Sequence, residues 1–408
     1  MRQNIISVRF KNILSFRDEN TVSFLADSKY HSKNDAPEKW NLIEHESLGK
    51  EKILPVVGLY GHNASGKSNL LKVNSVLGSL LNHRERSFRF AYSPFLLNDD
   101  SRKDLSEIEV ETIVNDIYYD YAVSFSYMKN EIVSETLSAA ERGGKVKKLY
   151  AKDAKGFHQT AKDFVPSDAV NEIKSLEGRR DLTVLEILHL RGLKVFTNLY
   201  NSLNTANSAI NFEKHFAKLY EDPAERKRIV DFIKEIDVGI TDIEIRKTEI
   251  RQPPSPLSEK ILLPRDNVTY QYIPVFIHSG YSIPFESDGT WVYFLHLLIF
   301  ADYFINGGIV IADEIERSLH PLILRKTFKM FHDKNINKAG AQLLFSSHDV
   351  SVLKSDVFRR DEIYFTEKEN DGSSSVYPMS MFKGLRGVKD YAKYYLDGYF
   401  GAVMLPGE

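Results

Sequence analysis

A glycine-bounded loop followed by lysine and serine is the stretch of this sequence with the clearest chemistry. Residues 61–68 read Gly-His-Asn-Ala-Ser-Gly-Lys-Ser, after an apolar run at 53–60 and before a helical pattern at 69–77. Glycine lets such a loop turn tightly, so that successive backbone N–H groups point inward at phosphate oxygens. The start of a helix adds a positive end. The order of strand, loop and helix therefore predicts a P-loop.

The side chains of this loop have separate expected roles. Lys67 is expected to reach the terminal phosphates, where it would also support catalysis. Ser68 is expected to offer its hydroxyl to Mg²⁺, an ion that keeps most of its coordination shell as water and phosphate oxygens. The residues expected to surround the phosphates are Gly61, His62, Asn63, Ala64, Ser65, Gly66, Lys67, Ser68 and Asn69.

Two further apolar runs end in polar residues that suit phosphate chemistry. Asp313 and Glu314 follow a Gly-Gly-Ile-Val-Ile-Ala run, which is the Walker B pattern. Asp313 would order the Mg²⁺ shell, and Glu314 would polarise the attacking water. His348 ends a second apolar run. As the third polar group at a strand end of this site, it is expected to contact the γ-phosphate.

A short turn at 286–290, Glu-Ser-Asp-Gly-Thr, precedes an apolar helical pattern at 291–298. A small turn that opens a helix is a second phosphate-binding element. An ordinary helix cap explains the same residues about as well, so the turn alone leaves both interpretations open.

Periodicity along the chain indicates a mixed α/β protein. Alternating residues predict a β-hairpin at 4–25 and an antiparallel meander at 105–150. Helical spacing predicts helices from 166 to 236, with Asp222 capping a helix that begins at Pro223. Residues 240–275 look β-rich around a proline-rich loop at 253–256, and 370–375 look like a hairpin tip.

Composition excludes several classes of function. The chain has 408 residues, a net charge of −2 and no cysteine, so it offers no disulfide, thiolate nucleophile or overall basic field. The first residues lack the apolar core of a signal peptide. The apolar region at 291–311 is broken by polar residues and a Gly-Gly pair, which predicts a buried helix, a turn and a buried strand rather than a membrane span. A cytoplasmic protein without membrane attachment is the expectation.

Taken in order, these motifs resemble an ABC-type ATPase head of the SMC/RecF/OLD-like class. In that class, the turn at 286–290 is the signature motif, 318–321 is the D-loop and His348 is the switch histidine. The opening residues 8–19 also resemble this class, in which the first hairpin covers the nucleotide. The resemblance therefore implies that Lys11 and Ser15 contact the base or ribose.

The fold implied is an α/β ABC-ATPase head with a RecA-like core, an antiparallel β lobe and a helical insertion. The ranges expected are 1–165 for an N-terminal β lobe with the P-loop, 166–240 for the helical insertion and 241–408 for a C-terminal RecA-like lobe. That last range would carry the signature, Walker B and switch histidine.

The activity implied is hydrolysis of ATP to ADP and phosphate with Mg²⁺. In this class two subunits close head to tail on two ATP molecules, so Ser287, Gly289 and Thr290 of one subunit would contact the ATP held by the other. More narrowly, the chain resembles stand-alone prokaryotic ATP-binding proteins of the AAA_15 and AAA_21 groups, RloA-like or AbiL-like. That implies a homodimer or higher oligomer that regulates a separately encoded effector, expected to be a nuclease, in toxin-antitoxin-like anti-phage defence.

Some features depart from the class, and two other functions stay open. No convincing Q-loop glutamine is found, although residues 92–95 occupy about the right place, and Trp291 stands where a polar residue often follows the signature. A RecF-like or SMC-like ATPase in DNA repair would need a basic groove, for which Arg142, Lys145, Lys147 and Lys148 are as suited as they are to a solvated hairpin tip. A small-molecule kinase would explain neither the signature turn nor the Asp-Glu pair.

Overall fold

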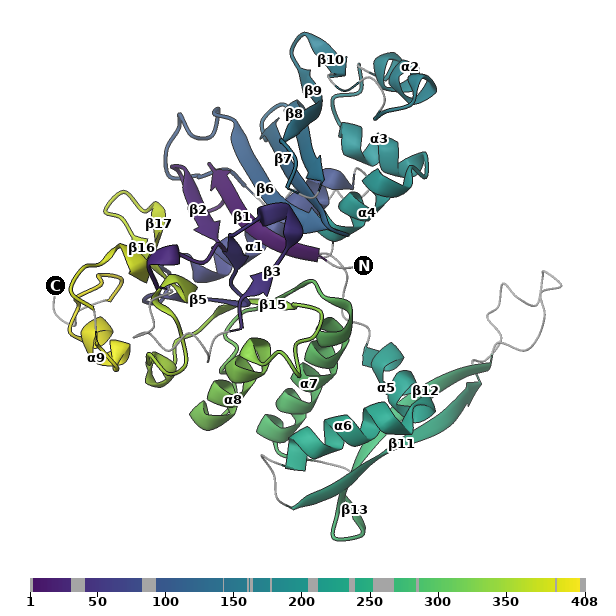
Figure 1. Ribbon diagram of the computed structural model, residues 1–408, viewed down its shortest axis with the longest axis vertical. Coiled ribbons are helices and arrows are strands. Elements are labelled where there is room, and N and C mark those ends of the chain that lie inside the picture. The colour runs from purple at the N-terminus through teal and green to yellow at the C-terminus, as the bar shows by residue number, and fades with distance from the viewer. Residues whose placement is uncertain are drawn as a thin grey trace. The chain divides into compact units, whose positions relative to one another are not determined.

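Two compact units make up the computed structural model of the chain. One unit comprises Met1–Ser208, Tyr303–Glu316 and Leu324–Glu408, and the other comprises Ala209–Asp302 and Arg317–Ile323 (Figure 1). The structure describes residues 3–30, 41–82, 93–141, 143–159, 161, 164–176, 178–204, 212–234, 239–251, 268–283, 286–385 and 387–403.

The five-stranded sheet of the first unit carries the predicted motifs. Its order is β14-β15-β5-β16-β17, with parallel pairing from β14 to β16 and an antiparallel edge strand β17. Parallel strands end at one edge of a sheet, so the segments after β5, β14 and β15 share that edge. The strands are β5 (Val56–Tyr60), β14 (Ile309–Ala312), β15 (Gln342–Ser346), β16 (Ile363–Lys368) and β17 (Ser374–Pro378).

The sequence suggested a single strand before the P-loop, but the structure divides this apolar run into two. It divides at Pro55 into β4 (Lys52–Ile53), which pairs with β3 (Ile43–Glu44), and the fully buried β5. Proline has no N–H to donate to a sheet, whereas its carbonyl accepts a hydrogen bond from Leu343 N at 2.8 Å. The proline therefore marks the point at which the chain changes partners.

A seven-stranded antiparallel sheet fills much of the rest of this unit, in the order β10-β9-β8-β7-β6-β1-β2. The hairpin predicted at 4–25 is confirmed by β1 and β2, and the meander at 105–150 by β6 to β9. The strands are β1 (Gln3–Lys11), β2 (Asn20–Ser23), β6 (Ser106–Val114), β7 (Ile117–Ser126), β8 (Glu131–Glu141), β9 (Lys147–Asp153) and β10 (Gly156–Gln159).

Helices of the first unit pack around a shared apolar core that includes side chains of both sheets. The P-loop helix α1 begins at Lys67 and buries nine of its residues. The expected tip at 370–375 is the turn between β16 and β17. The helices that lie wholly in this unit are α1 (Lys67–Leu81), α2 (Ser167–Ser175), α3 (Val184–Leu190), α4 (Lys194–Leu203) and α9 (Tyr391–Leu396).

The second unit places helices against a long β-ribbon. The strands β11 (Ile240–Arg251) and β12 (Val268–His278) pair along their length, β13 (Tyr281–Ile283) extends the sheet, and α5 (Phe212–Glu221) and α6 (Pro223–Lys234) lie against it (Figure 1). Asp222 Oδ1 accepts hydrogen bonds from the N–H groups of Ala224 and Glu225, at 2.9 and 3.0 Å, which confirms the predicted cap. The proline-rich loop at 253–256 lies outside the described residues.

The helix α7 (Asp288–Asn306) begins in the second unit, and α8 (Pro321–His332) also has its first turn there. Phe294 of α7 stacks on Phe216 with centroids 6.0 Å apart and meets Phe276 edge-on at 5.3 Å. The predicted order of helix, glycine turn and buried strand over 291–311 is confirmed by α7, Gly307 and β14. A search of the described helices finds none whose length and apolarity would suit a membrane span.

The mixed α/β class expected from the sequence is confirmed. The helices within 166–240 are divided between the units, with α2 to α4 in the first and α5 and α6 in the second. The three ranges 1–165, 166–240 and 241–408 describe expected functional parts, and they stay a prediction.

Candidate nucleotide-binding site

The P-loop joins the end of β5 to the start of α1. Both of its glycines have positive φ angles. Gly61 has φ 157° and Gly66 has φ 117°. A Cβ at Gly61 would collide with the Thr366 carbonyl oxygen, and one at Gly66 would lie 2.7 Å from Ser374 Oγ. These positions therefore require glycine for both conformation and space.

Lys67 is buried at the first position of α1 and points back over the loop. Its Nζ donates hydrogen bonds to the carbonyls of Gly61 at 2.7 Å and His62 at 3.1 Å. Burial lowers the pKa of the Lys67 ammonium. The carboxylates that oppose this lowering of the pKa belong to Asp313, Glu316 and Glu314. The structure thus brings the Walker B acids near the P-loop lysine.

Segments far away in the sequence hold the loop. Ser65 Oγ and Thr366 Oγ1 share a hydrogen bond of 2.6 Å, and His62 N donates to Ala402 O at 2.9 Å. Asn69 Nδ2 donates to Ser15 Oγ at 3.0 Å. The first hairpin loop, β16 and the C-terminal segment therefore all contact the phosphate-binding loop.

Ser346, at the end of β15, positions both acids of the Walker B pair. Its hydroxyl donates to Asp313 Oδ1 and accepts a hydrogen bond of 2.8 Å from the backbone N–H of Glu314. Both acidic side chains are exposed at the sheet edge. Glu314 has φ 49°, a left-handed conformation that costs a non-glycine residue about 1 kcal/mol and is typical of functional sites.

His348 is tied to a third carboxylate. Its backbone N–H donates to Glu316 Oε1 at 2.6 Å, while its side chain is exposed. Glu316 Oε2 is buried and has no hydrogen-bond partner among the described residues. A buried carboxylate oxygen beside the P-loop lysine is suited to accept from a ligand or its bound water.

The turn at 286–290 lies in the second unit and is held by local bonds. Thr290 N donates to Ser287 Oγ at 3.1 Å, and the two hydroxyls lie 2.8 Å apart. Glu286 Oε1 pairs with His278 Nε2 at 2.5 Å. A Cβ at Gly289 would lie 2.7 Å from Ser318 O, in the segment expected to be the D-loop. Ser287 thus caps α7, which is compatible with either interpretation of this turn.

The two residues expected to contact the base or ribose have different surroundings. Ser15 contacts Asn69, directly after the P-loop. Lys11 instead lines a groove of about 510 Å³ on the antiparallel sheet, beside Glu107 of β6. The chain bends between them, because Asn12 and Leu14 have left-handed backbones with φ of 52° and 54°.

Sequence reasoning missed several residues that shape the site. Ser346 and Glu316 lie two or three residues from predicted motif residues, so their position next to the motifs was an available signal. Thr366, Ser374 and Ala402 are about 300 residues from the loop they support, and no local pattern marks them. Of the segment expected at the Q-loop position, Tyr92 lies outside the described residues, while Ser93 O accepts from Leu14 N at 2.8 Å.

A family model matches residues 56–354, a span that includes the P-loop, the turn at 286–290, the Walker B acids and His348. That family is described as "AAA domain, putative AbiEii toxin, Type IV TA system". The chain belongs to this family of P-loop ATPases. No curated protein matches the chain.

The residues present fit the Mg²⁺–nucleotide complex that this ATPase family generally binds. Asp313 is oriented by Ser346, and Ser68 lies in the first turn of α1. No group of three metal-ligating side chains occurs in the described part of the chain. Mg²⁺ is commonly bound by one or two protein oxygens, with phosphates and water completing its octahedron, so a site for the Mg²⁺–nucleotide complex does not require such a group.

Proposed function

We propose that this family member binds ATP with Mg²⁺ and hydrolyses it to ADP and phosphate. One observation carries the proposal: Lys67 is buried with its Nζ bonded to the P-loop carbonyls, and Ser346 holds Asp313 and Glu314 together at the end of a strand of the same sheet. A lysine for the phosphates and acids for the metal and water are the groups that phosphoryl transfer to water requires.

Each motif residue has a role in this proposal. The backbone of residues 61–69 would cradle the phosphates, and Ser68 with Asp313 would hold Mg²⁺. The ion would neutralise charge that develops on the β- and γ-phosphate oxygens. Glu314 would accept a proton from the attacking water, and His348 would contact the γ-phosphate. Ser346 supports the proposal because it fixes the Asp313 carboxylate and the Glu314 backbone together.

We further propose that the active form is a head-to-tail dimer of an ABC-type head. The five-stranded sheet would be its RecA-like core, the seven-stranded sheet its β lobe and the helices of 166–240 its helical insertion. Ser287, Gly289 and Thr290 of one subunit would contact ATP in the partner. Support comes from the turn itself, which opens the 19-residue helix α7 and presents Ser287 to solvent.

The closed dimer would regulate a separate effector, with a nuclease as the expected kind, in bacterial anti-phage defence. ATP would then act as a clamp between subunits, and hydrolysis would release it. The family description, which names a toxin and a type IV toxin-antitoxin system, supports this context. The closer likeness to RloA-like or AbiL-like proteins is part of the same proposal.

The test is the solution mass of Glu314→Gln with and without ATP and Mg²⁺, beside the same variant carrying Ser287→Arg. We expect the single variant to bind ATP, turn it over at a small fraction of the normal rate and double its mass. The double variant should bind ATP and stay at its original mass. Lys67→Ala, as a control, should lose ATP binding.

Three outcomes would contradict the proposal. Normal turnover by Glu314→Gln would refute its role as the base. A mass that ATP does not change, in a variant that binds ATP, would refute the nucleotide-dependent dimer. Release of a phosphorylated acceptor instead of free phosphate would indicate a kinase.

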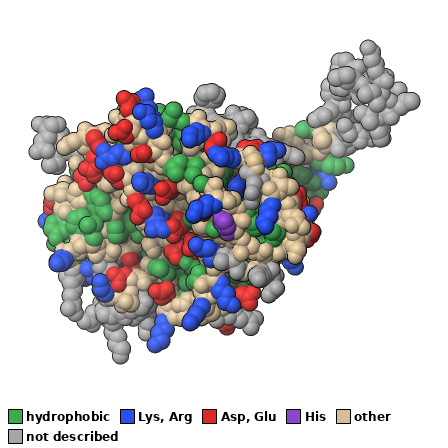
Figure 2. Space-filling model, turned by 90° about the horizontal axis from the view of Figure 1, so that it is seen from above, with side chains coloured by type: hydrophobic (Ala, Val, Ile, Leu, Met, Phe, Trp, Pro, Cys, Tyr) green, Lys and Arg blue, Asp and Glu red, His purple; other side chains and the backbone are tan. Residues whose placement is uncertain are grey.

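The alternative of a DNA-binding repair ATPase depends on basic surface. Lys145 is exposed in the turn between β8 and β9, and Lys147 and Lys148 are exposed at the start of β9. On the face shown in Figure 2, however, acidic and basic side chains of the described residues are interspersed. DNA affinity that falls steeply with salt, and that weakens when these three lysines are changed to glutamine, would favour this alternative.

A further inference from the structure

Residues 346–348, at the end of β15, lie between two other elements of the site. On one side, Ser347 N donates to Leu59 O at 3.1 Å, which joins the segment to β5 just before the P-loop. On the other side, Ser346 O accepts from Ile315 N at 3.2 Å, which joins it to the chain directly after the Walker B acids. This segment is therefore held through its backbone from both sides.

Glu316 adds a side-chain contact to the segment and uses only one of its oxygens. Its Oε1 accepts from His348 N at 2.6 Å, whereas its Oε2 is buried and has no hydrogen-bond partner among the described residues. Burial lowers the pKa of the nearby Lys67 ammonium, and the Glu316 charge is one of those that oppose this change. A carboxylate has about four acceptor positions, so Glu316 Oε2 can accept from a donor.

Tyr60, the last residue of β5, ends in a hydroxyl with the complementary property. The residue is 0% exposed, and its hydroxyl has no hydrogen-bond partner among the described residues. Its ring meets Phe345 of β15 edge-on, with centroids 6.2 Å apart. Burial raises the pKa of the Tyr60 hydroxyl, and Glu316 contributes the largest of the charge effects, which raises it further. The Ser347 hydroxyl lies near Tyr60 and opposes that rise, but not in hydrogen-bonding geometry.

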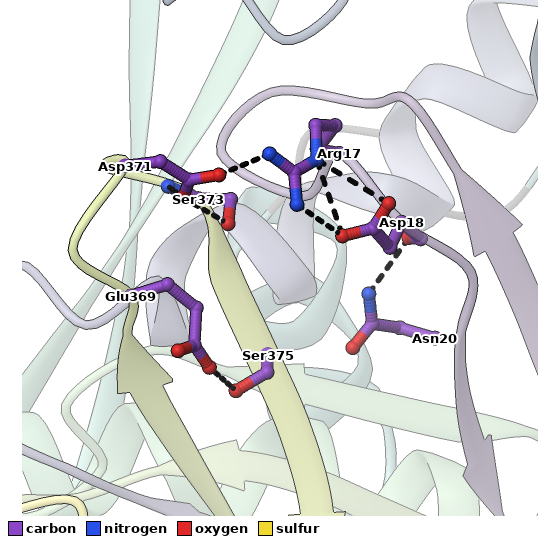
Figure 3. Close-up of polar contacts among 7 residues, drawn as sticks. All are labelled: Arg17, Asp18, Asn20, Glu369, Asp371, Ser373 and Ser375. Carbon is purple, nitrogen blue, oxygen red and sulfur yellow. Dashed lines mark hydrogen bonds and ion pairs between the residues drawn. The ribbon is translucent and has the colours of Figure 1, made fainter.

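Charged groups in the hairpins beside the P-loop bond to one another instead. Arg17 pairs with Asp18 at 2.8 Å and also with Asp371 (Figure 3). Glu369 Oε1 accepts from a neighbouring serine hydroxyl at 2.8 Å. These three carboxylates are exposed, so water can serve their remaining positions. An enclosed donor and an enclosed acceptor without partners are uncommon and require an explanation.

Binding of ATP would change the balance of charge at Glu316. Without nucleotide, the carboxylate lies near the positive charge of Lys67. The phosphates would take over that positive charge, and their own negative charge would repel a carboxylate nearby. A neutral donor such as the Tyr60 hydroxyl stabilises a carboxylate by a charge-assisted hydrogen bond. A contact between the two would satisfy both enclosed atoms, which offsets the cost of moving them.

We propose that Tyr60 and Glu316 are positioning residues for His348. In the ATP-bound state the Tyr60 hydroxyl donates to Glu316 Oε2, while Glu316 Oε1 holds the backbone of His348 in place for the γ-phosphate. The inference rests on the proposed ATP hydrolysis and adds its dependence on the γ-phosphate, since ADP would leave the pair apart. In this role neither residue touches the nucleotide, so the pair acts on the rate and not on the affinity.

The test is steady-state hydrolysis of ATP by Tyr60→Phe, in the otherwise unchanged chain and in a His348→Ala background. A hydrogen bond to a charged group is strong, so its removal should lower kcat about tenfold, while ATP affinity stays within about threefold. In His348→Ala, the change should cause no further loss, because the hydroxyl acts through His348. Without nucleotide, the thermal midpoint of Tyr60→Phe should stay the same or rise, because an enclosed hydroxyl without a partner is removed.

Tyr364→Phe is the matched control for this variant. Tyr364 is also buried, in the neighbouring strand β16. Its hydroxyl, however, donates to Ser23 O at 3.1 Å and accepts from Ser23 N at 3.0 Å. The control should therefore lose thermal stability and keep its kcat.

Glu316→Ala provides a second readout. It should lower kcat at least as much as Tyr60→Phe does, and the two changes together should cost no more than Glu316→Ala alone. Glu316→Gln keeps an oxygen for His348 N–H and should recover part of the loss. Glu369→Ala, the same change at an exposed carboxylate, should leave kcat unchanged.

The results that would overturn this inference separate it from the proposed function. An unchanged kcat in Tyr60→Phe, beside a slow His348→Ala, would refute it and leave the proposed hydrolysis intact. Equal losses in both backgrounds, or losses that multiply when Tyr60→Phe is added to Glu316→Ala, would show that Tyr60 does not act through Glu316 and His348. Hydrolysis by His348→Ala at the normal rate, or none by the wild type, would refute the proposed function as well.

Discussion

The starts of α1 and α7 are two phosphate-binding candidates that are built in different ways. The P-loop before α1 is held by Ser15, Thr366 and Ala402, which come from three distant parts of the chain. The turn before α7 is held by the Ser287 cap and by the pair of Glu286 with His278. The first loop therefore depends on the tertiary fold, whereas the second is formed by residues within about a dozen positions of one another.

This difference suits their proposed tasks. A loop that must bind phosphates benefits from rigid contacts with the rest of its subunit, because preorganised hydrogen-bond donors need no rearrangement on binding. A turn that acts on a partner's nucleotide has to remain exposed until the partner arrives. Changes far away in the sequence should disturb the P-loop, and only local changes should disturb the turn before α7.

The largest effect is expected from Gly61→Ala. The new methyl group would collide with the Thr366 carbonyl oxygen, so the loop would move away from β16. We expect ATP affinity to fall at least about 100-fold and the free energy of unfolding to fall by about 2 kcal/mol. Calorimetric titration with ATP and thermal unfolding measure the two effects.

Gly49→Ala is the matched control for that variant. Gly49 also has a positive φ, of 61°, but an added Cβ would meet nothing within 4 Å. It should therefore lose about 1 kcal/mol from backbone strain alone and keep its ATP affinity. Equal losses of affinity in both variants would contradict the importance of the contact with β16.

A smaller effect is expected from Ser346→Ala, which removes the hydroxyl shared by Asp313 and Glu314. Residues that orient metal ligands typically contribute 10- to 100-fold. We expect kcat for ATP hydrolysis to fall by about that factor while ATP affinity stays within about threefold. Ser347→Ala, at the next buried serine, should change kcat little, since the Ser347 hydroxyl accepts from Asp349 N instead.

The local elements of this fold were predictable, and the support of the P-loop was not. Period-two alternation identified the hairpin β1–β2, and the order of strand, glycine loop and helix identified β5 and α1. Thr366 lies in β16 and Ser374 in β17, the hairpin at one edge of the five-stranded sheet. The sequence there indicated only a turn. Their contact with the P-loop depends on the order of the strands. Strand order is a long-range property that residue spacing does not encode.

Ser15 and Lys11 show the same limit within one segment. Both were expected near the nucleotide on the same resemblance, yet Ser15 contacts Asn69, while Lys11 ends β1 and lines a groove on the antiparallel sheet. The left-handed backbones at Asn12 and Leu14 separate them. Such conformations in non-glycine residues are uncommon, so periodicity could not have predicted the bend.

Ser287 offers a test of whether the turn at 286–290 is more than a helix cap. Ser287→Ala removes the acceptor for Thr290 N and should lower the free energy of unfolding by about 1 kcal/mol. Ser287→Asn restores a capping acceptor and should recover that stability. If the turn contacts a partner's phosphate, hydrolysis should stay low in Ser287→Asn, because the amide does not reproduce the shape of the hydroxyl. Recovery of both stability and hydrolysis would reduce the turn to a cap.

The smallest effect concerns pH and separates the two helices again. The helix α1 contains no histidine, whereas α7 contains His296, whose Nδ1 is enclosed without a hydrogen-bond partner among the described residues. Burial lowers the pKa of this ring. The folded chain therefore holds it neutral while the unfolded chain takes up a proton below its usual pKa of about 6.5. The stability that this neutral ring allows is present above about pH 6.5 and is lost as the pH falls towards the folded pKa, at up to about 1.4 kcal/mol per pH unit.

In His296→Leu, denaturant unfolding measured from pH 7.5 to pH 5.5 should show a smaller loss of stability than in the wild type. Equal losses in the two proteins would assign the acid sensitivity to other groups.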